Sequence, residues 1–274
     1  MKKLIKGLLP ALCSMALLFS CSEKPLPQAL NALEDPSLGI TTYEVDQLQG
    51  KTTLDQHSIQ YKVVDDKGNY YIQLLIDEHK LEAWINYNPE VLIHDGHQAV
   101  LSQEQKELLL SFSNQLGEAL VTSNGNSSTD FEIGWMEYAF LRTVEFWSQA
   151  PNGFVHDYRT NTATVSKSTG NDGVTCIKRG TSYSLYYTDR NNTTISKRRT
   201  AGYNGGGSYD CMGRCGAACG SWWAASSWTL DCFEHDQCSL DYGASGGGND
   251  ANCGDEWWEA SDDWVYGVSR GCSG

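Results

Sequence analysis

Basic residues are nearly absent from the last quarter of the chain. Residues 201–274 contain eleven acidic side chains but only two arginines, Arg214 and Arg270, so this segment carries most of the net charge of −14. Because contacts to phosphates need a basic surface, the deficit argues against a nucleic-acid-binding function. An acidic segment suits a cation site better; the alternative is that the acidic excess only keeps a small secreted domain soluble.

The apolar run at the N-terminus is too short for a transmembrane helix. It extends from Leu8 to Phe19 after three lysines, which is typical of a secretory signal peptide. It ends in Leu18-Phe19-Ser20-Cys21, which resembles a bacterial lipobox, and the aspartate typical of inner-membrane retention does not follow. We therefore expect residues 1–20 to be a lipoprotein signal peptide, and acyl chains on Cys21 to anchor the exported protein to the outer membrane.

Cysteine is missing from the middle of the chain. None occurs between Cys21 and Cys176, whereas seven of the last eight cysteines follow residue 210. Eight cysteines in an exported protein indicate about four disulfide bonds, with about 105 possible pairings. The C-terminal part is therefore expected to be a small disulfide-stapled domain, and the part before it is not.

The segment before the cysteines divides into a tether and a folded domain. Residues 21–40 contain three prolines and are expected to be a tether from the membrane. Residues 41–153 begin with strand-like alternation and continue with two amphipathic helices, each opened by a capping box, at Ser102 and at Thr129. We expect an α+β domain of unknown function here, because its periodic apolar positions are ordinary core faces.

Residues 154–202 are expected to connect the two domains. Ser182 to Thr188 and Thr193 to Thr200 flank a turn-forming run and predict a β-hairpin. The basic run at 197–199 is more typical of a solvated strand face than of a binding patch. A glycine-rich run then leads into the cysteine-rich domain, residues 203–274.

A dense chemical motif lies near the middle of the cysteine-rich domain. His235 is followed directly by Asp236, and the pair is flanked by Cys232 and Cys238. In a helix, Cys232, His235, Asp236 and Ser239 share one face, because residues three and four apart are neighbours there. An isolated His-Asp pair is most often a surface accident, so the surrounding residues must decide its meaning.

A loop rich in small residues precedes this motif. Residues 209–220 contain three cysteines, three glycines and two alanines. Small residues let the backbone turn tightly and direct its carbonyl groups toward one point. Calcium binds oxygen ligands, including backbone carbonyls and carboxylates, so the loop and a nearby aspartate predict a calcium site.

Together the loop and the motif resemble a known family. The pattern Cys-Gly-X-X beginning at Cys215, followed by Cys-X-X-His-Asp-X-Cys beginning at Cys232, resembles the secreted phospholipase A2 superfamily. The resemblance covers about residues 203–274. It implies a small, mainly α, disulfide-stapled domain with two antiparallel helices. It also implies calcium-dependent hydrolysis of the sn-2 acyl ester of glycerophospholipids at a membrane or micelle surface.

The resemblance also implies roles for individual residues. His235 matches the general base, and Asp236 matches the carboxylate ligand of Ca²⁺. Arg214, Gly216 and Ala218 match the loop positions whose carbonyl oxygens bind the ion. The chemistry is consistent, because an imidazole can activate water near neutrality and a cation can stabilise an oxyanion. The backbone N–H of Gly216 is a candidate second oxyanion donor.

The base needs a carboxylate partner, which the family places on the following helix. Asp255 is the expected partner and Asp262 is the alternative. The resemblance further pairs Cys215 with Cys232 and Cys238 with Cys253. The remaining cysteines are expected to pair as Cys211 with Cys272 and Cys176 with Cys219.

Three alternatives remain open at this point. The domain is alternatively a non-catalytic calcium- or lipid-binding module, or a hydrolase of another ester. Zinc bound by Cys211, Cys215, Cys219 and His235 is a third option, although zinc thiolates are rare in oxidising compartments. The six tryptophans after residue 220 are expected either to dock on lipid or to fill the core of a small domain.

Overall fold

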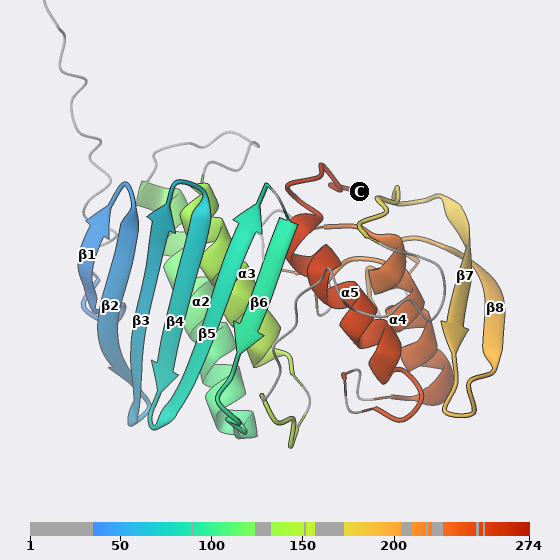
Figure 1. Ribbon diagram of the computed structural model, residues 1–274, viewed down its shortest axis with the longest axis horizontal. Coiled ribbons are helices and arrows are strands. Elements are labelled where there is room, and N and C mark those ends of the chain that lie inside the picture. Colours follow the sequence, from blue (N-terminus) through green and yellow to red (C-terminus); the bar gives the residue numbers. More distant parts are fainter. Residues whose placement is uncertain are drawn as a thin grey trace, which may run out of the picture.

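A six-stranded antiparallel sheet forms one end of the molecule (Figure 1). The computed structural model describes residues 35–88, 90–123, 133–150, 152–156, 173–203, 210–216, 219–220, 227–244, 247–248 and 250–274. Each strand pairs with the next one in the chain, in the order β1-β2-β3-β4-β5-β6. The strands are β1 (Ile40–Glu44), β2 (Gln47–Leu54), β3 (His57–Asp66), β4 (Asn69–Ile76), β5 (His79–Tyr87) and β6 (Glu90–Asp95).

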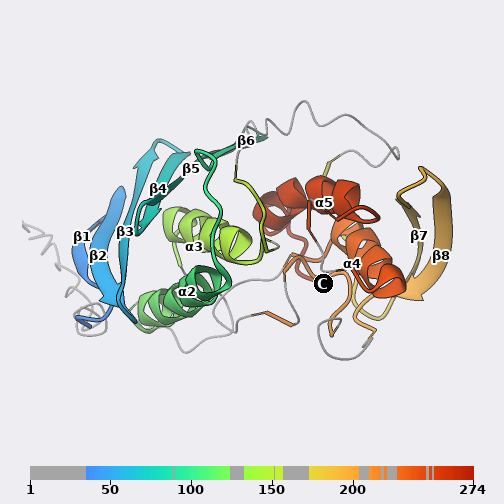
Figure 2. The same ribbon diagram turned by 90° about the horizontal axis from the view of Figure 1, so that it is seen from below.

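Two helices cover one face of this sheet, α2 (Gln103–Ser123) and α3 (Trp135–Ser148) (Figure 2). The covered face is built from alternate strand residues, including Tyr61, Val63, Ile72 and Leu74, all of which are buried. The expected combination of strands and helices is therefore present, with the sheet as its larger element. The folded part begins earlier than expected, because Leu38 is buried in the core and β1 begins at Ile40, so the tether predicted for residues 21–40 ends before Leu38.

The capping box at Ser102 is confirmed. The backbone N–H of Gln105 donates to Ser102 Oγ at 3.1 Å, and the backbone N–H of Ser102 donates to Gln105 Oε1 at 3.0 Å. The capping box expected at residues 129–132 lies outside the described residues, and α3 begins at Trp135 after Gly134.

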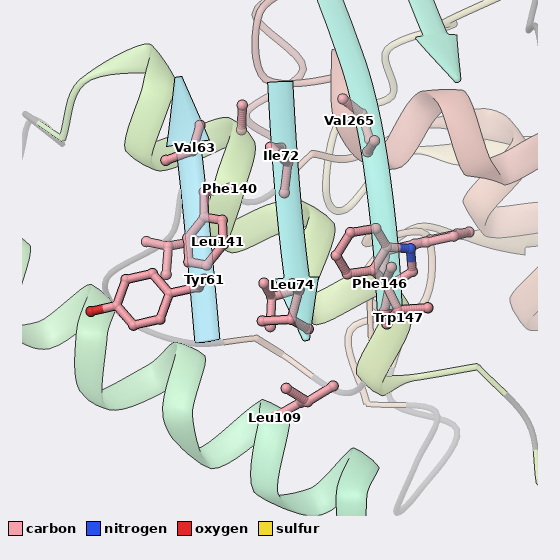
Figure 3. Packing of buried hydrophobic residues seen from close by; sticks show 14 of the residues in the cluster. Tyr61, Val63, Ile72, Leu74, Leu109, Phe140, Leu141, Phe146, Trp147 and Val265 are labelled. Carbon is pink, nitrogen blue, oxygen red and sulfur yellow. The ribbon is translucent and has the colours of Figure 1, made fainter. Parts of the chain in front are cut away.

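Helix α3 is buried along almost its whole length. Every residue from Met136 to Ser148 is buried, because the helix packs against the sheet and α2 on one side and against α5 (Gly254–Tyr266) on the other. The ring of Phe146 stacks on Trp257 with centroids 4.9 Å apart. Figure 3 shows Val265 of α5 reaching the cluster that also contains Phe146 and Ile72. One apolar core therefore runs from the sheet through α3 into the C-terminal part.

The C-terminal part is built from two helices and a hairpin. Helix α4 (Leu230–Tyr242) runs antiparallel to α5, since Cys238 near its end is bonded to Cys253 just before α5. The expected hairpin is present as β7 (Ser182–Thr188) and β8 (Thr194–Thr200), and it packs on α4 (Figure 1). Two antiparallel, disulfide-linked helices are thus confirmed for this part.

Side chains of α4 bind the hairpin. The backbone N–H of Tyr186 donates to the Glu234 carboxylate at 2.7 Å. Of the basic run on β8, Lys197 donates to Asp241 at 2.6 Å and Arg199 donates to Gln237 at 2.8 Å. Two of the three basic side chains therefore attach the hairpin to α4, and Arg198 is exposed.

Two of the four expected disulfide pairings are confirmed. Cys215 is bonded to Cys232, and Cys238 to Cys253. The other two expected pairings, Cys211 with Cys272 and Cys176 with Cys219, are wrong. The bonds instead join Cys176 to Cys272 and Cys211 to Cys219.

The difference between the expected and the observed pairings has a local cause. Cys211 and Cys219 lie at the two ends of one tight loop, with Cα atoms 5.1 Å apart. Cys176 and Cys272 both flank the segment around Trp228, which accepts a hydrogen bond from Ile177 and donates one to Cys272. Because Cys211, Cys215 and Cys219 are all in disulfides, they are not free to bind zinc as thiolates.

The predictions for the N-terminus concern residues that the structure does not describe. Residues 1–34, which include the expected signal peptide and Cys21, lie outside the described part of the chain. Among the helices that the structure does describe, none has the length and apolar character needed to cross a bilayer.

Two buried histidines predict a loss of stability in acid. His94 and His156 are 2% and 1% exposed. Burial lowers the pKa of His94 to about 3 and that of His156 to about 4. In the unfolded chain these histidines bind protons near pH 6.5, so their burial does not lower the free energy of unfolding above that pH. The free energy of unfolding falls by about 1.4 kcal/mol per histidine for each pH unit below it.

His94→Phe is the test, because a phenyl ring keeps the stacking on Phe146 without a titrating group. Urea unfolding between pH 7 and pH 4.5 should show a pH dependence shallower than that of the wild type by about 1.4 kcal/mol per pH unit. Equal slopes in the two proteins would show that His94 does not titrate in this way.

Candidate functional site

Helix α4 holds the two residues of the His-Asp motif. The helix begins after Thr229, which has extended backbone angles, and ends at Gly243, whose left-handed φ of 57° suits glycine. Cys232 and Cys238 attach the helix to the preceding loop and to the start of α5. The side chains of His235 and Asp236 are 17% and 25% exposed, so both are held at a partly covered surface.

His235 is poised as a neutral imidazole. Its Nε2 lies 3.4 Å from Ser239 Oγ, one turn along the helix, and its Nδ1 lies 3.8 Å from Asp236 Oδ1. Burial lowers the pKa of His235 to about 4, and the negative charge of Asp250 opposes this shift. At neutral pH the ring is therefore uncharged, and a pKa this far below 7 makes it a weaker base than a free imidazole.

Asp236 contacts the loop that precedes the helix. Its Oδ2 accepts a hydrogen bond from the backbone N–H of Gly213 at 2.8 Å. Burial raises the pKa of Asp236 to about 7, against the opposing effects of that hydrogen bond and of the Arg214 charge. Within the described residues, no lysine or arginine forms an ion pair with this carboxylate, which leaves it suited to a cation.

The loop beside Asp236 is tightly turned. Gly213 and Gly216 have φ values of 93° and 108°, which side-chain-bearing residues rarely adopt. At Gly213 a Cβ atom would also lie 2.8 Å from the side chain of Ile177. Arg214 and Gly216, two of the expected carbonyl ligands, lie in this turn, whereas Ala218 lies outside the described residues. The positive φ of Gly213 and the hydrogen bond from its N–H to Asp236 thus hold the loop next to this carboxylate.

A buried charge cluster joins this loop to α3. Arg142 and Glu145, one turn apart on α3, form an ion pair, and Glu145 Oε1 also lies 3.9 Å from Arg214 Nη2. Arg142 donates to the carbonyl of Cys215 at 3.3 Å and lies 5.2 Å from the ring centre of Trp264. Burial and the charge of Arg142 lower the pKa of Arg214 to about 10.

This charge cluster was not predicted from the sequence. A signal was available, because Arg142 and Glu145 interrupt the apolar pattern of α3 at the spacing of one helical turn. The cluster fixes the backbone of Cys215, and through the neighbouring turn it fixes the loop beside Asp236.

The structure does not bring the expected carboxylate partner to His235. Asp255 accepts a hydrogen bond from the hydroxyl of Thr188 on β7. Asp262, the alternative, groups with Asp231 and Asp263. Besides the neighbouring Asp236, the carboxylate whose charge acts on His235 is that of Asp250, which accepts backbone hydrogen bonds from Asn252 and Cys253 ahead of α5.

Asp250 was missed because it precedes the helix on which a partner was sought. The family pattern directs attention to the residues after Cys253, and Asp250 lies three residues before it.

The described tryptophans of the C-terminal part contribute to cores. Trp228, Trp257 and Trp264 are buried, and Trp258 is partly buried against the main core. Trp222 and Trp223 lie outside the described residues.

The comparisons with known proteins concern the C-terminal part. A family model described as "Domain of unknown function (DUF8213)" matches residues 160–274. The match spans less than half of the chain and includes the hairpin, the loop, α4 and α5. No curated protein and no solved structure matches the chain.

Proposed function

We propose that this protein hydrolyses the sn-2 acyl ester of glycerophospholipids in a calcium-dependent reaction. The observation that carries the proposal is the pairing of two groups on α4. His235 Nδ1 lies 3.8 Å from Asp236 Oδ1, and the partly exposed Asp236 carboxylate accepts a hydrogen bond from the backbone N–H of Gly213 in the loop. The disulfide from Cys215 to Cys232 supports the proposal, because the resemblance to phospholipases A2 implied it.

The residues present fit a calcium ion. Asp236 offers a carboxylate whose pKa is raised by burial, against the opposing effect of the Arg214 charge, so a bound cation would stabilise its ionised form. The carbonyl oxygens of Arg214, Gly216 and Ala218 are the proposed further ligands, and oxygen-only ligation suits Ca²⁺. When bound, the ion would supply the positive charge that stabilises the developing oxyanion.

The chain's own residues would carry the proton transfers. His235 accepts a proton from water as the water oxygen attacks the ester carbonyl. It then returns that proton to the departing glycerol oxygen, which leaves a free fatty acid and a lysophospholipid. The N–H of Gly216 is the proposed second donor to the oxyanion. The negative charge of Asp250 favours the imidazolium that forms in between, which makes Asp250 a better placed partner than Asp255.

The proposed substrate is a membrane lipid, and the proposed location of the protein is therefore at a membrane. We propose that the protein is exported and is anchored through acyl chains on Cys21, so that the site works at a phospholipid surface. The anchoring motif is a sequence pattern at residues 18–21.

A second candidate function is a non-catalytic calcium- or lipid-binding lipoprotein on the same scaffold. The observation that favours it is the position of Asp255, which is bonded to Thr188 instead of His235. Among the described residues, no carboxylate lies within 3.5 Å of a ring nitrogen of His235. An imidazole without a bonded carboxylate is a weaker catalytic base.

The experiment that separates the two functions measures fatty acid release from mixed phospholipid vesicles, with Ca²⁺ and with a chelator. The wild type should release fatty acid only with Ca²⁺. Asp236→Asn removes the carboxylate ligand but keeps the size of the side chain, so calcium affinity at this site and hydrolysis should fall together. Wild-type protein that binds vesicles but releases no fatty acid at any calcium level would establish the binding module instead.

A further inference from the structure

A second group of carboxylates joins α4 to α5. Asp231 lies in the first turn of α4, and Asp262 and Asp263 lie in the last turn and a half of α5. One oxygen of each lies within 4.8 Å of the others. Asp231 and Asp263 are 3% and 0% exposed, whereas Asp262 is partly exposed and gives access from solvent. Neither His235 nor Asp236 is part of this group.

The buried members of the group have polar atoms without partners. Both carboxylate oxygens of Asp263 and Oδ1 of Asp231 are buried and make no hydrogen bond of normal geometry. The Thr229 hydroxyl and the Asp231 backbone lie beside Asp263, and Arg270 adds one positive charge. Glu234 and Glu259 add negative charge around Asp231. The group is therefore strongly acidic, and the Thr229 hydroxyl, the Asp231 backbone N–H and the Arg270 charge offset only part of the cost of burying its carboxylates.

Such an arrangement is costly unless a positive species joins it. An ionised carboxylate buried without a partner is strongly unfavourable, and two that face each other also repel. The positive species is either a shared proton or a metal cation. The cluster offers oxygen ligands from three carboxylates and one open side at Asp262, which is the chemistry of a calcium site and not of a zinc or copper site.

We propose that Asp231, Asp262 and Asp263 bind a calcium ion that cross-links α4 and α5, separately from Asp236. The position of the cluster along the helix pair supports a bridging role. The disulfide between Cys238 and Cys253 joins the end of α4 to the start of α5. The ion would join the start of α4 to the end of α5, so that both ends of the antiparallel pair are fastened. This proposal does not depend on the proposed enzymatic activity.

The test is calcium titration by calorimetry together with thermal unfolding, on the full-length oxidised protein. Asp236→Asn should lose calcium binding at the active site and keep the cluster's ion. Asp263→Asn should lose the cluster's ion, and so should Asp231→Asn. Asp255→Asn removes one exposed charge from the same helix outside the cluster, and it should bind the same number of ions as the wild type.

Thermal unfolding adds a readout that simple misfolding would not produce. At 100 times its dissociation constant, calcium should raise the Tm of Asp236→Asn by about 5–10 °C. Asp263→Asn should lack the part of this Tm increase that comes from calcium bound at the cluster. With a chelator it should be at least as stable as the wild type, because one of two facing buried charges is gone. Asp262→Asn changes a partly exposed group and should weaken binding by at least about 10–100-fold.

Two results would overturn the proposal. One is a calcium stoichiometry that Asp236→Asn reduces to zero and Asp263→Asn leaves unchanged. The other is an Asp263→Asn variant whose Tm differs from that of the wild type by the same amount with calcium and with a chelator. The second result would show that the cluster holds a shared proton.

Discussion

His235→Gln is expected to reduce fatty acid release from vesicles by about 10²–10⁴-fold, the contribution of a general base. Glutamine keeps a polar side chain of similar length that can still contact Ser239, but it cannot accept a proton from water. The neighbouring Asp236 and its hydrogen bond from Gly213 are untouched, so calcium affinity should stay within a factor of about two of the wild type. The measurement is the initial rate at saturating calcium, with calcium binding measured on the same preparation.

His79→Gln serves as the matched control, because His79 lies at the start of β5 and takes no part in the site. It should leave both the rate and calcium binding unchanged. A His235→Gln protein with the wild-type rate would exclude His235 as the base. A loss of calcium affinity in His235→Gln would show that the substitution disturbs the loop and not only the chemistry.

Glu145→Gln is expected to lower the free energy of unfolding by about 3–5 kcal/mol, the cost of breaking a buried ion pair. Glu145 is 3% exposed and lies against the guanidinium groups of Arg142 and Arg214, both of which are buried. A neutral amide of the same size would leave those two like charges facing each other. Urea unfolding at pH 7 measures the change.

Glu137→Gln is the control for this substitution. Glu137 is a buried glutamate on the same helix, but it accepts a hydrogen bond from the Tyr43 hydroxyl at 2.9 Å instead of pairing with arginine. Weakening this hydrogen bond should lower the free energy of unfolding by only about 1 kcal/mol. Equal destabilisation by the two substitutions would mean that the ion pairs among Arg142, Glu145 and Arg214 stabilise the protein no more than an ordinary buried hydrogen bond does.

The sequence predicts local elements well because their signals are local. The alternation of the strands, the capping box at Ser102 and the hairpin at residues 182–200 all depend on neighbouring residues, and the structure contains each of them. The disulfides of α4 follow from the resemblance, because the cysteines at 232 and 238 are part of its motif.

The remaining features depend on contacts between distant segments. The pairing of Cys176 with Cys272 spans 96 residues and requires the segments around Ile177 and Trp228 to be neighbours, which no local pattern reveals. The position of Asp255 depends on Thr188 of the hairpin, which was expected to be only a connector. The burial of Arg142 depends on α5 covering the second side of α3.

The double-sided burial of α3 has a consequence for how the protein can be divided. The four disulfides among the described residues all join cysteines from Cys176 onward, and α3 contains no cysteine, so only the backbone ties α3 covalently to α5. A recombinant fragment limited to residues 160–274 would expose Trp257 and Trp264 and would leave Arg214 without Glu145. Such a fragment needs a surrogate for α3, and the first half of the chain, supplied as a separate polypeptide, is the natural complement to it.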